Sequence, residues 1–153
     1  MPADVATWAL FAAFALYGAY SDIRFRTIPN LFNVVMAVTG LLATWFVGGE
    51  VAAGLGLVHV AIALALGMLL YALHMWGGGD AKFYAASAAW FEFWDFPRLA
   101  VSIALAGLLL LIVWFGARQF RGSPKFDKKS KELPYGVAIA IGGTAALALP
   151  LLL

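Results

Sequence analysis

The sequence predicts an all-α integral membrane protein of about six transmembrane helices, with both termini on the outer side of the membrane. Hydrophobic residues make up 64% of the 153 residues and charged residues only 12%, whereas ordinary soluble domains carry roughly 25% charged residues. The apolar residues gather in runs that approach the ~20 residues needed to cross a bilayer. The basic residues gather in alternate connections between these runs, which is typical of a polytopic membrane protein.

Short connections join the expected spans, which predicts a single membrane domain over residues 1–153. Gly48-Gly49-Glu50 predicts a turn, and Gly77-Gly78-Gly79-Asp80 predicts a break, because glycine disfavours helix. Arg118–Leu133 is the one clearly hydrophilic segment, and it separates the last two spans. The expected spans are Pro2–Tyr20, Pro29–Val47, Val51–Trp76, Ala81–Trp94, Leu99–Ala117 and Pro134–Leu153.

The basic residues fix the expected orientation. With six spans, one side of the membrane receives Arg98 alone among the basic residues. By the positive-inside rule the other side is the cytoplasm, so the chain is expected in the cell inner membrane with both termini outside. The basic residues on the expected cytoplasmic side are Arg24, Arg26, Lys82, Arg118, Arg121, Lys125, Lys128, Lys129 and Lys131.

Several function classes are excluded by composition. The absence of cysteine excludes a disulfide framework, a zinc–thiolate site and a cysteine nucleophile. No basic, aromatic-interleaved surface suggests nucleic acid as a partner. His59 and His74 lack a second ligand at metal spacing, so no metal or cofactor is expected. The expected surroundings are the lipid bilayer.

Asp22 and Asp80 are the candidate catalytic residues. Asp22 is expected just past the first span and Asp80 just before the fourth, which puts both carboxylates at similar depth on the cytoplasmic side. Two neighbouring carboxylates do not ionise equally, so one can activate a water while the other donates a proton. Taken singly, each has a structural alternative: Asp22 pairs with Arg24 or Arg26, and Asp80 caps the fourth helix.

Three motifs resemble those of the type IV prepilin peptidases, a family of membrane aspartyl peptidases. Gly77-Gly78-Gly79-Asp80 with Lys82 resembles the family's G-x-G-D motif and its downstream lysine. Asp22-Ile23-Arg24 followed by Ile28-Pro29-Asn30 resembles its first-aspartate motif. Leu133-Pro134-Tyr135-Gly136 with Ala138-Ile139 resembles its late P-Y-G-x-A-I element. G-x-G-D alone is weakly specific, but the three elements in this order cover nearly the whole chain.

The resemblance implies catalytic roles for Asp22 and Asp80. It implies an endopeptidase that removes the short leader from prepilin or pseudopilin substrates at the cytoplasmic face, just before the substrate's hydrophobic segment. The chain departs from the long members of the family, which carry paired cysteines and also N-methylate the product. It is more similar to the short peptidases of Flp-type (tight adherence) pili or to archaeal preflagellin peptidases.

Six further residues are candidates for substrate binding. Gly77, Gly78 and Gly79 allow the backbone to approach a substrate strand or to bend away from it. Lys82 anchors the substrate or extends to the lipid headgroups, and both interpretations stay open. Pro29 and Asn30 complete the set, although Pro29 also suits a helix start and Asn30 also suits hydrogen bonding between helices.

Two other functions stay open on the sequence. A small ion- or proton-coupled transporter or channel subunit also uses carboxylates in the membrane, but these more often lie near the midplane in broken helices. A catalytically silent membrane scaffold would tolerate replacement of both aspartates by asparagine.

Overall fold

The computed structural model describes residues 4–120 and 135–152, and these residues form helices and no strands. The helices are α1 (Val5–Phe25), α2 (Asn30–Ala72), α3 (Gly78–Ala88), α4 (Phe96–Phe120) and α5 (Tyr135–Leu152), with a short 3₁₀ turn, η1 (Phe93–Asp95). The all-α class predicted from the sequence is therefore confirmed. The predicted hydrophilic loop lies outside the described residues from residue 121 onward.

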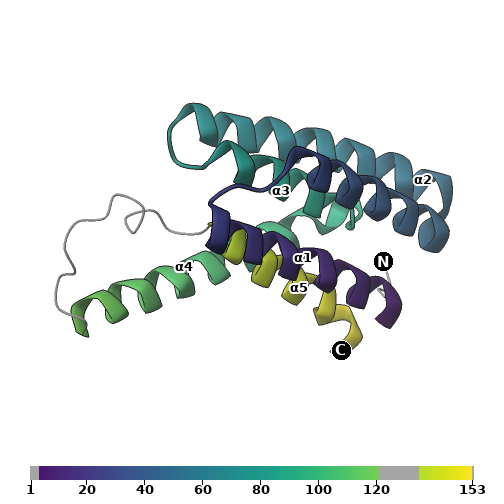
Figure 1. Ribbon diagram of the computed structural model, residues 1–153. Coiled ribbons are helices and arrows are strands. Elements are labelled where there is room, and N and C mark those ends of the chain that lie inside the picture. The colour runs from purple at the N-terminus through teal and green to yellow at the C-terminus, as the bar shows by residue number, and fades with distance from the viewer. Residues whose placement is uncertain (1–3, 121–134, 153) are drawn as a thin grey trace.

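Helix α2 is two helices joined at one residue. Gly49 has φ 76° and ψ −171°, a backbone conformation that glycine adopts at little cost. The chain reverses there, and the two halves of α2 run side by side in opposite directions (Figure 1). The predicted turn at Gly48–Glu50 is therefore confirmed.

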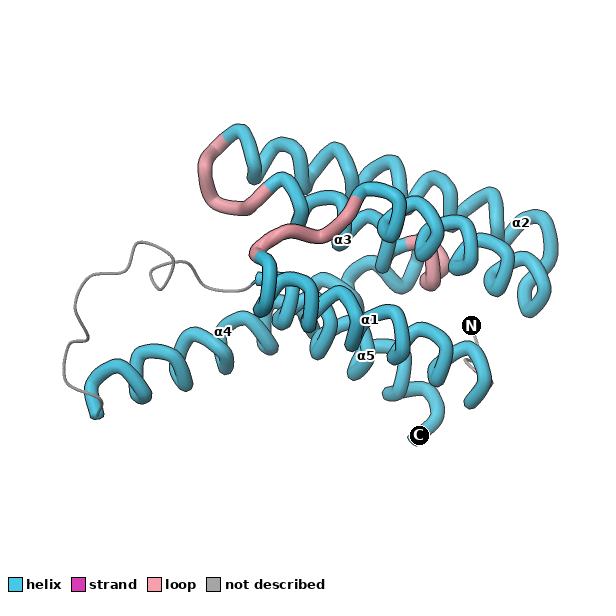
Figure 2. Tube along the Cα trace, viewed as in Figure 1, coloured by secondary structure: helices cyan, strands magenta, loops and turns pink. Residues whose placement is uncertain are grey.

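Helix α3 lies between two layers. The paired halves of α2 cover one side, while α1 and α5 cover the other (Figures 1 and 2). Most of α3 is buried, including Ala81 and every residue from Phe83 to Ala88. Helix α4 diverges from the other helices along its length (Figure 1).

An aromatic core fixes one end of α3. Trp90 is 1% exposed, and its indole N–H donates to the carbonyl of Met36 at 3.1 Å. Phe11 of α1 meets the Trp90 ring edge-on, with ring centroids 5.5 Å apart. The Thr44 hydroxyl donates to the carbonyl of Ala89 at 3.0 Å. These contacts join α1, the first half of α2 and the end of α3.

The outer surface of the described helices is apolar. Leu16, Leu31, Phe46 and Val51 each expose more than 70% of their surface, although water-soluble monomers rarely expose large contiguous apolar areas. Two stretches, Asn30–Ala72 and Phe93–Ala117, are long and apolar enough to cross a membrane. Together with the composition, this surface describes a membrane protein.

Helix boundaries differ from the sequence prediction at both aspartates. Helix α1 continues past Tyr20 to Phe25, so Asp22 lies inside the helix rather than after it. Helix α3 begins at Gly78, so Asp80 lies in its first turn rather than before it. The expected third span ends at Ala72 rather than Trp76, and the expected fourth helix ends at Ala88 rather than Trp94.

Replacing Gly142 should destabilise the fold. A Cβ at Gly142 of α5 would lie 2.5 Å from the Cα of Ile103 on α4, so the two backbones must separate. We expect Gly142→Ala to lower the free energy of unfolding by about 1–3 kcal/mol. Gly54→Ala is the matched control, because no atom lies within 4 Å of its added Cβ. Thermal unfolding in detergent measures the stability of both variants. A Gly142→Ala midpoint equal to that of Gly54→Ala would contradict the close α4–α5 contact.

Candidate active site

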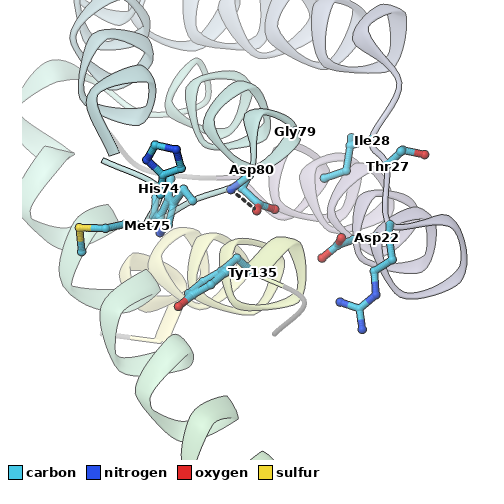
Figure 3. Close-up of a pocket in the computed structure, with 11 residues that line it drawn as sticks. Asp22, Thr27, Ile28, His74, Met75, Gly79, Asp80 and Tyr135 are labelled. Atoms are coloured by element: carbon cyan, nitrogen blue, oxygen red, sulfur yellow. Dashed lines mark hydrogen bonds between the residues drawn. The ribbon is translucent and has the colours of Figure 1, made fainter. Parts of the chain in front are cut away.

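Asp22 and Asp80 line one cavity of about 330 Å³. Their side chains enter it from opposite sides, and the carboxyl groups point toward one another (Figure 3). The cavity lies where the end of α1 and the starts of α3 and α5 meet. The residues that line it are Asp22, Arg26, Thr27, Ile28, His74, Met75, Trp76, Gly77, Gly79, Asp80 and Tyr135.

The last turn of α1 positions Asp22. Helix α1 ends at Phe25, and its C-cap residue Arg26 has a left-handed φ of 56° and donates its N–H to the Asp22 carbonyl at 3.0 Å. The Ser21 hydroxyl donates to the carbonyl of Thr27 at 2.7 Å and fixes the start of the connection to α2. The Asp22 residue is 7% exposed. Its Oδ2 accepts the backbone N–H of Gly136 in the first turn of α5 at 2.9 Å.

The first turn of α3 positions Asp80. Its Oδ2 accepts the backbone N–H of Gly77 at 3.2 Å, drawn as a dashed line in Figure 3. The bond satisfies a backbone donor at the start of the helix. Gly77 leaves room for this contact, because a Cβ there would lie 2.9 Å from Asp80 Oδ2. The triple glycine therefore brings the carboxyl group close against the backbone.

The cavity changes the ionisation of both aspartates, which lie beyond the expected spans Pro2–Tyr20 and Ala81–Trp94. Burial raises the pKa of Asp80 to about 6, and the negative charge of Asp22 adds to the rise. Burial also raises the pKa of Asp22, against the lowering effects of the Gly136 N–H and the Arg26 guanidinium. A carboxyl pair in which one member keeps its proton up to about pH 6 is suited to acid–base catalysis.

The candidate substrate-binding residues fall into two groups. Gly77 and Gly79 line the cavity, whereas Gly78, Lys82, Pro29 and Asn30 are not among its lining residues. Lys82 donates to Asn30 Oδ1 at 2.9 Å, which joins the start of α2 to α3. Pro29 lines a different, shallow groove beside Phe14 and Phe32.

Several residues that line the cavity are not among the sites predicted from the sequence. Arg26, Thr27 and Ile28 directly follow the turn that bears Asp22, and His74, Met75 and Trp76 directly precede the triple glycine. Tyr135 belongs to the late P-Y-G element, whose resemblance to the family could have drawn attention to it. Gly136 carries no side chain, and its contact with Asp22 joins residues far apart in the chain.

An apolar groove of about 520 Å³ adjoins the aspartate cavity. Trp76 and Tyr135 line both spaces, and their ring centroids are 6.4 Å apart. The groove continues between the second half of α2, α4 and α5. Its walls include small residues, among them Ala104 and Gly107 of α4.

These features define a class: a helical membrane protein with two carboxyl groups facing each other at one end of its helices. The chain belongs to the type IV leader peptidase family, whose model matches residues 9–116 and so includes both aspartates. The family predicted from the sequence motifs is thereby confirmed.

A curated relative supports the same family. The chain is 26% identical over 147 residues to a prepilin leader peptidase/N-methyltransferase of Pectobacterium carotovorum subsp. carotovorum. The match covers 91% of this chain and 50% of the relative, so the chain spans half of that relative's length. No solved structure matches the chain significantly.

Asp80→Asn should stabilise the protein at alkaline pH. Because the pKa of Asp80 is raised to about 6, its stabilising contribution is greatest in acid and falls as pH rises through that value. Asparagine does not ionise, so we expect the variant to gain on the order of 2 kcal/mol at pH 8 and much less at pH 4.

Thermal unfolding in detergent at the two pH values measures this difference. Asp4→Asn is the control, because Asp4 is exposed, accepts the Thr7 N–H and has a lowered pKa. It should show no gain at pH 8. An Asp80→Asn midpoint equal to that of wild type at both pH values would contradict the proposed cost of ionising Asp80.

Proposed function

We propose that this protein is a membrane aspartyl endopeptidase that removes the leader peptide from prepilin-like proteins at the cytoplasmic face of the cell inner membrane. One observation carries the proposal: in a chain of the leader peptidase family, Asp22 and Asp80 face each other in a single cavity. The proposed substrates are prepilins or pseudopilins. Methyl transfer, named for the longer relative, is not part of the proposal.

The chemistry needs only the two carboxyl groups and a water molecule. The ionised aspartate accepts a proton from water as the water oxygen bonds to the scissile carbonyl carbon, and the protonated aspartate donates its proton to the carbonyl oxygen. In the second step the first proton passes to the leaving nitrogen and the C–N bond breaks. The intermediate's hydroxyl returns a proton to the second aspartate, which restores the starting state.

The membrane arrangement is part of the proposal. We take the apolar parts of α1, the two halves of α2, α3, α4 and α5 as six spans, with both termini outside and with the end turns that carry Asp22 and Asp80 beyond the spans. The end of α1, the start of α2 and the start of α3 then share the cytoplasmic side, where Arg24, Arg26 and Lys82 lie. The aspartates lie in end turns of their helices, which favours a peptidase at the membrane surface over a transporter with midplane carboxylates.

Asp22→Asn and Asp80→Asn test the catalytic pair. Each variant should lower the rate of leader removal by at least about a hundredfold, because each removes one member of the acid–base pair. The assay follows the mobility shift of a prepilin in membranes that hold equal amounts of wild type or variant. Cleavage by either variant at the wild-type rate would overturn the paired-aspartate mechanism.

The adjoining apolar groove is the proposed site for the substrate's hydrophobic segment. A chain bound between the aspartates leaves the cavity past Trp76 and Tyr135, where the walls become apolar. This placement keeps the leader toward the cytoplasmic side and the hydrophobic segment away from water.

Gly107→Leu should weaken substrate binding by filling this groove. The added Cβ makes only ordinary contact with Ala138, at 3.7 Å, so the rest of the side chain projects into the groove without displacing α5. We expect KM for a prepilin to rise about tenfold, equal to about 1.4 kcal/mol of binding, with kcat little changed. Gly116→Leu on the same helix is the control, since no atom lies within 4 Å of its added Cβ. An unchanged KM in Gly107→Leu would place the segment elsewhere.

A further inference from the structure

Gly136 contributes only its backbone to the candidate site, yet it is the residue of α5 that contacts a catalytic carboxyl group. We propose that Gly136 is a positioning residue whose N–H holds Asp22 as the ionised base, so that Asp80 carries the proton of the pair. The assignment rests on the proposed peptidase function and gives the two aspartates distinct roles.

The start of α5 is suited to stabilise a negative charge. The first four N–H groups of a helix have no partner within it, and the helix dipole adds partial positive charge there. Asp22 Oδ2 accepts one of these groups, the Gly136 N–H, at 2.9 Å. A carboxylate of α1 thus caps a different helix and couples the position of Asp22 to that of α5. Hydrogen bonds to an ionised acceptor are stronger than those to a neutral one, so the contact favours the charged form of Asp22.

Glycine is required at this position by the closeness of Asp22. A Cβ at residue 136 would lie 2.8 Å from Asp22 Oδ2, 2.9 Å from its Cβ and 3.0 Å from its Cγ. These distances are shorter than ordinary van der Waals contact along the whole carboxyl-bearing side chain, so even alanine would displace Asp22. The absence of a side chain at residue 136 therefore sets the distance between the carboxyl group and the helix start.

The surroundings of the two aspartates favour the charged form of Asp22 over that of Asp80. Asp22 has the shorter bond to a backbone N–H, 2.9 Å against 3.2 Å for Asp80 with Gly77. The Arg26 guanidinium and the Gly136 N–H lower the pKa of both aspartates, but Gly136 donates its hydrogen bond to Asp22. Asp80 faces the negative charge of Asp22, which adds to the rise of its pKa to about 6. The other titratable side chains that line the cavity are His74, from the connection between α2 and α3, and Tyr135 of α5.

Removing the N–H without adding atoms is the sharpest test. Glycolic acid placed at position 136 by nonsense suppression replaces the Gly136 amide with an ester, which lacks the donor. Loss of a hydrogen bond to a charged group should raise the pKa of Asp22 by about one unit, so the acidic limb of the kcat–pH profile moves up by about one pH unit. At pH values below the midpoint of that limb, we expect kcat of the ester variant to be about tenfold lower than that of wild type. KM for a prepilin should stay within twofold of wild type. The same ester exchange at Val137 controls for a general effect on the helix.

Gly136→Ala is the second variant and should lower kcat at all pH values by displacing Asp22, while Gly116→Ala should leave it unchanged. If Gly136→Ala does not accumulate in the membrane, the ester variant decides. Suppose that wild type cleaves prepilins and that the ester variant has an unchanged kcat, or a lower kcat with an unshifted pH profile. Either result overturns the proposed role of Gly136 and leaves the proposed peptidase function intact. A wild type that does not cleave prepilins overturns the proposed function and this assignment with it.

Discussion

The packing of α3 between α2 and the α1–α5 layer is the constraint on which the site depends (Figure 1). Small residues allow the close approach: a Cβ at Gly67 of α2 would lie 3.0 Å from Ala81, and one at Gly18 of α1 would lie 2.5 Å from Phe83. Ala81 directly follows Asp80, so the contact that seats α3 on α2 also sets the depth of the second carboxyl group. The geometry of the pair thus depends on helix packing as well as on the hydrogen bonds of the two carboxyl groups.

The aspartate site destabilises the folded state, whereas the packing at the other end of α3 stabilises it. Two partly buried carboxyl groups that face each other raise the free energy of the folded state, because burial and like charge both disfavour ionisation. Trp90, Phe11 and Thr44 form a hydrogen-bonded aromatic core at the far end of the same short helix. An unfavourable cluster held in place by favourable packing elsewhere is the pattern expected of a functional site.

The sequence was sufficient for the helical class, the turn at Gly49 and the placement of Asp22 and Asp80 at one end of the molecule. It was insufficient for the helix ends, because Ser21–Phe25 contains no residue that stops a helix, and α1 ends where Arg26 turns left-handed and Ser21 bonds to Thr27. The proposed role of Gly136 could not be predicted from the sequence either. Its contact with Asp22 depends on how α1 and α5 pack, which no local pattern encodes. The number of membrane spans and their orientation stay predictions.

The size and walls of the cavity constrain how a peptide would bind. A volume of about 330 Å³ is near the lower end of the range for small-ligand sites, so it accommodates the scissile bond and few neighbouring side chains. One wall is firm, because the N–H groups of Met75 and Trp76 both donate to the carbonyl of Leu70 and tie that connection to α2. The opposite boundary is the start of α5, where Tyr135 borders the apolar groove. A longer substrate therefore extends past α5, and any shift of α5 that admits it also moves the Gly136 N–H relative to Asp22. Substrate binding and the ionisation of the catalytic pair would then be coupled through one helix end.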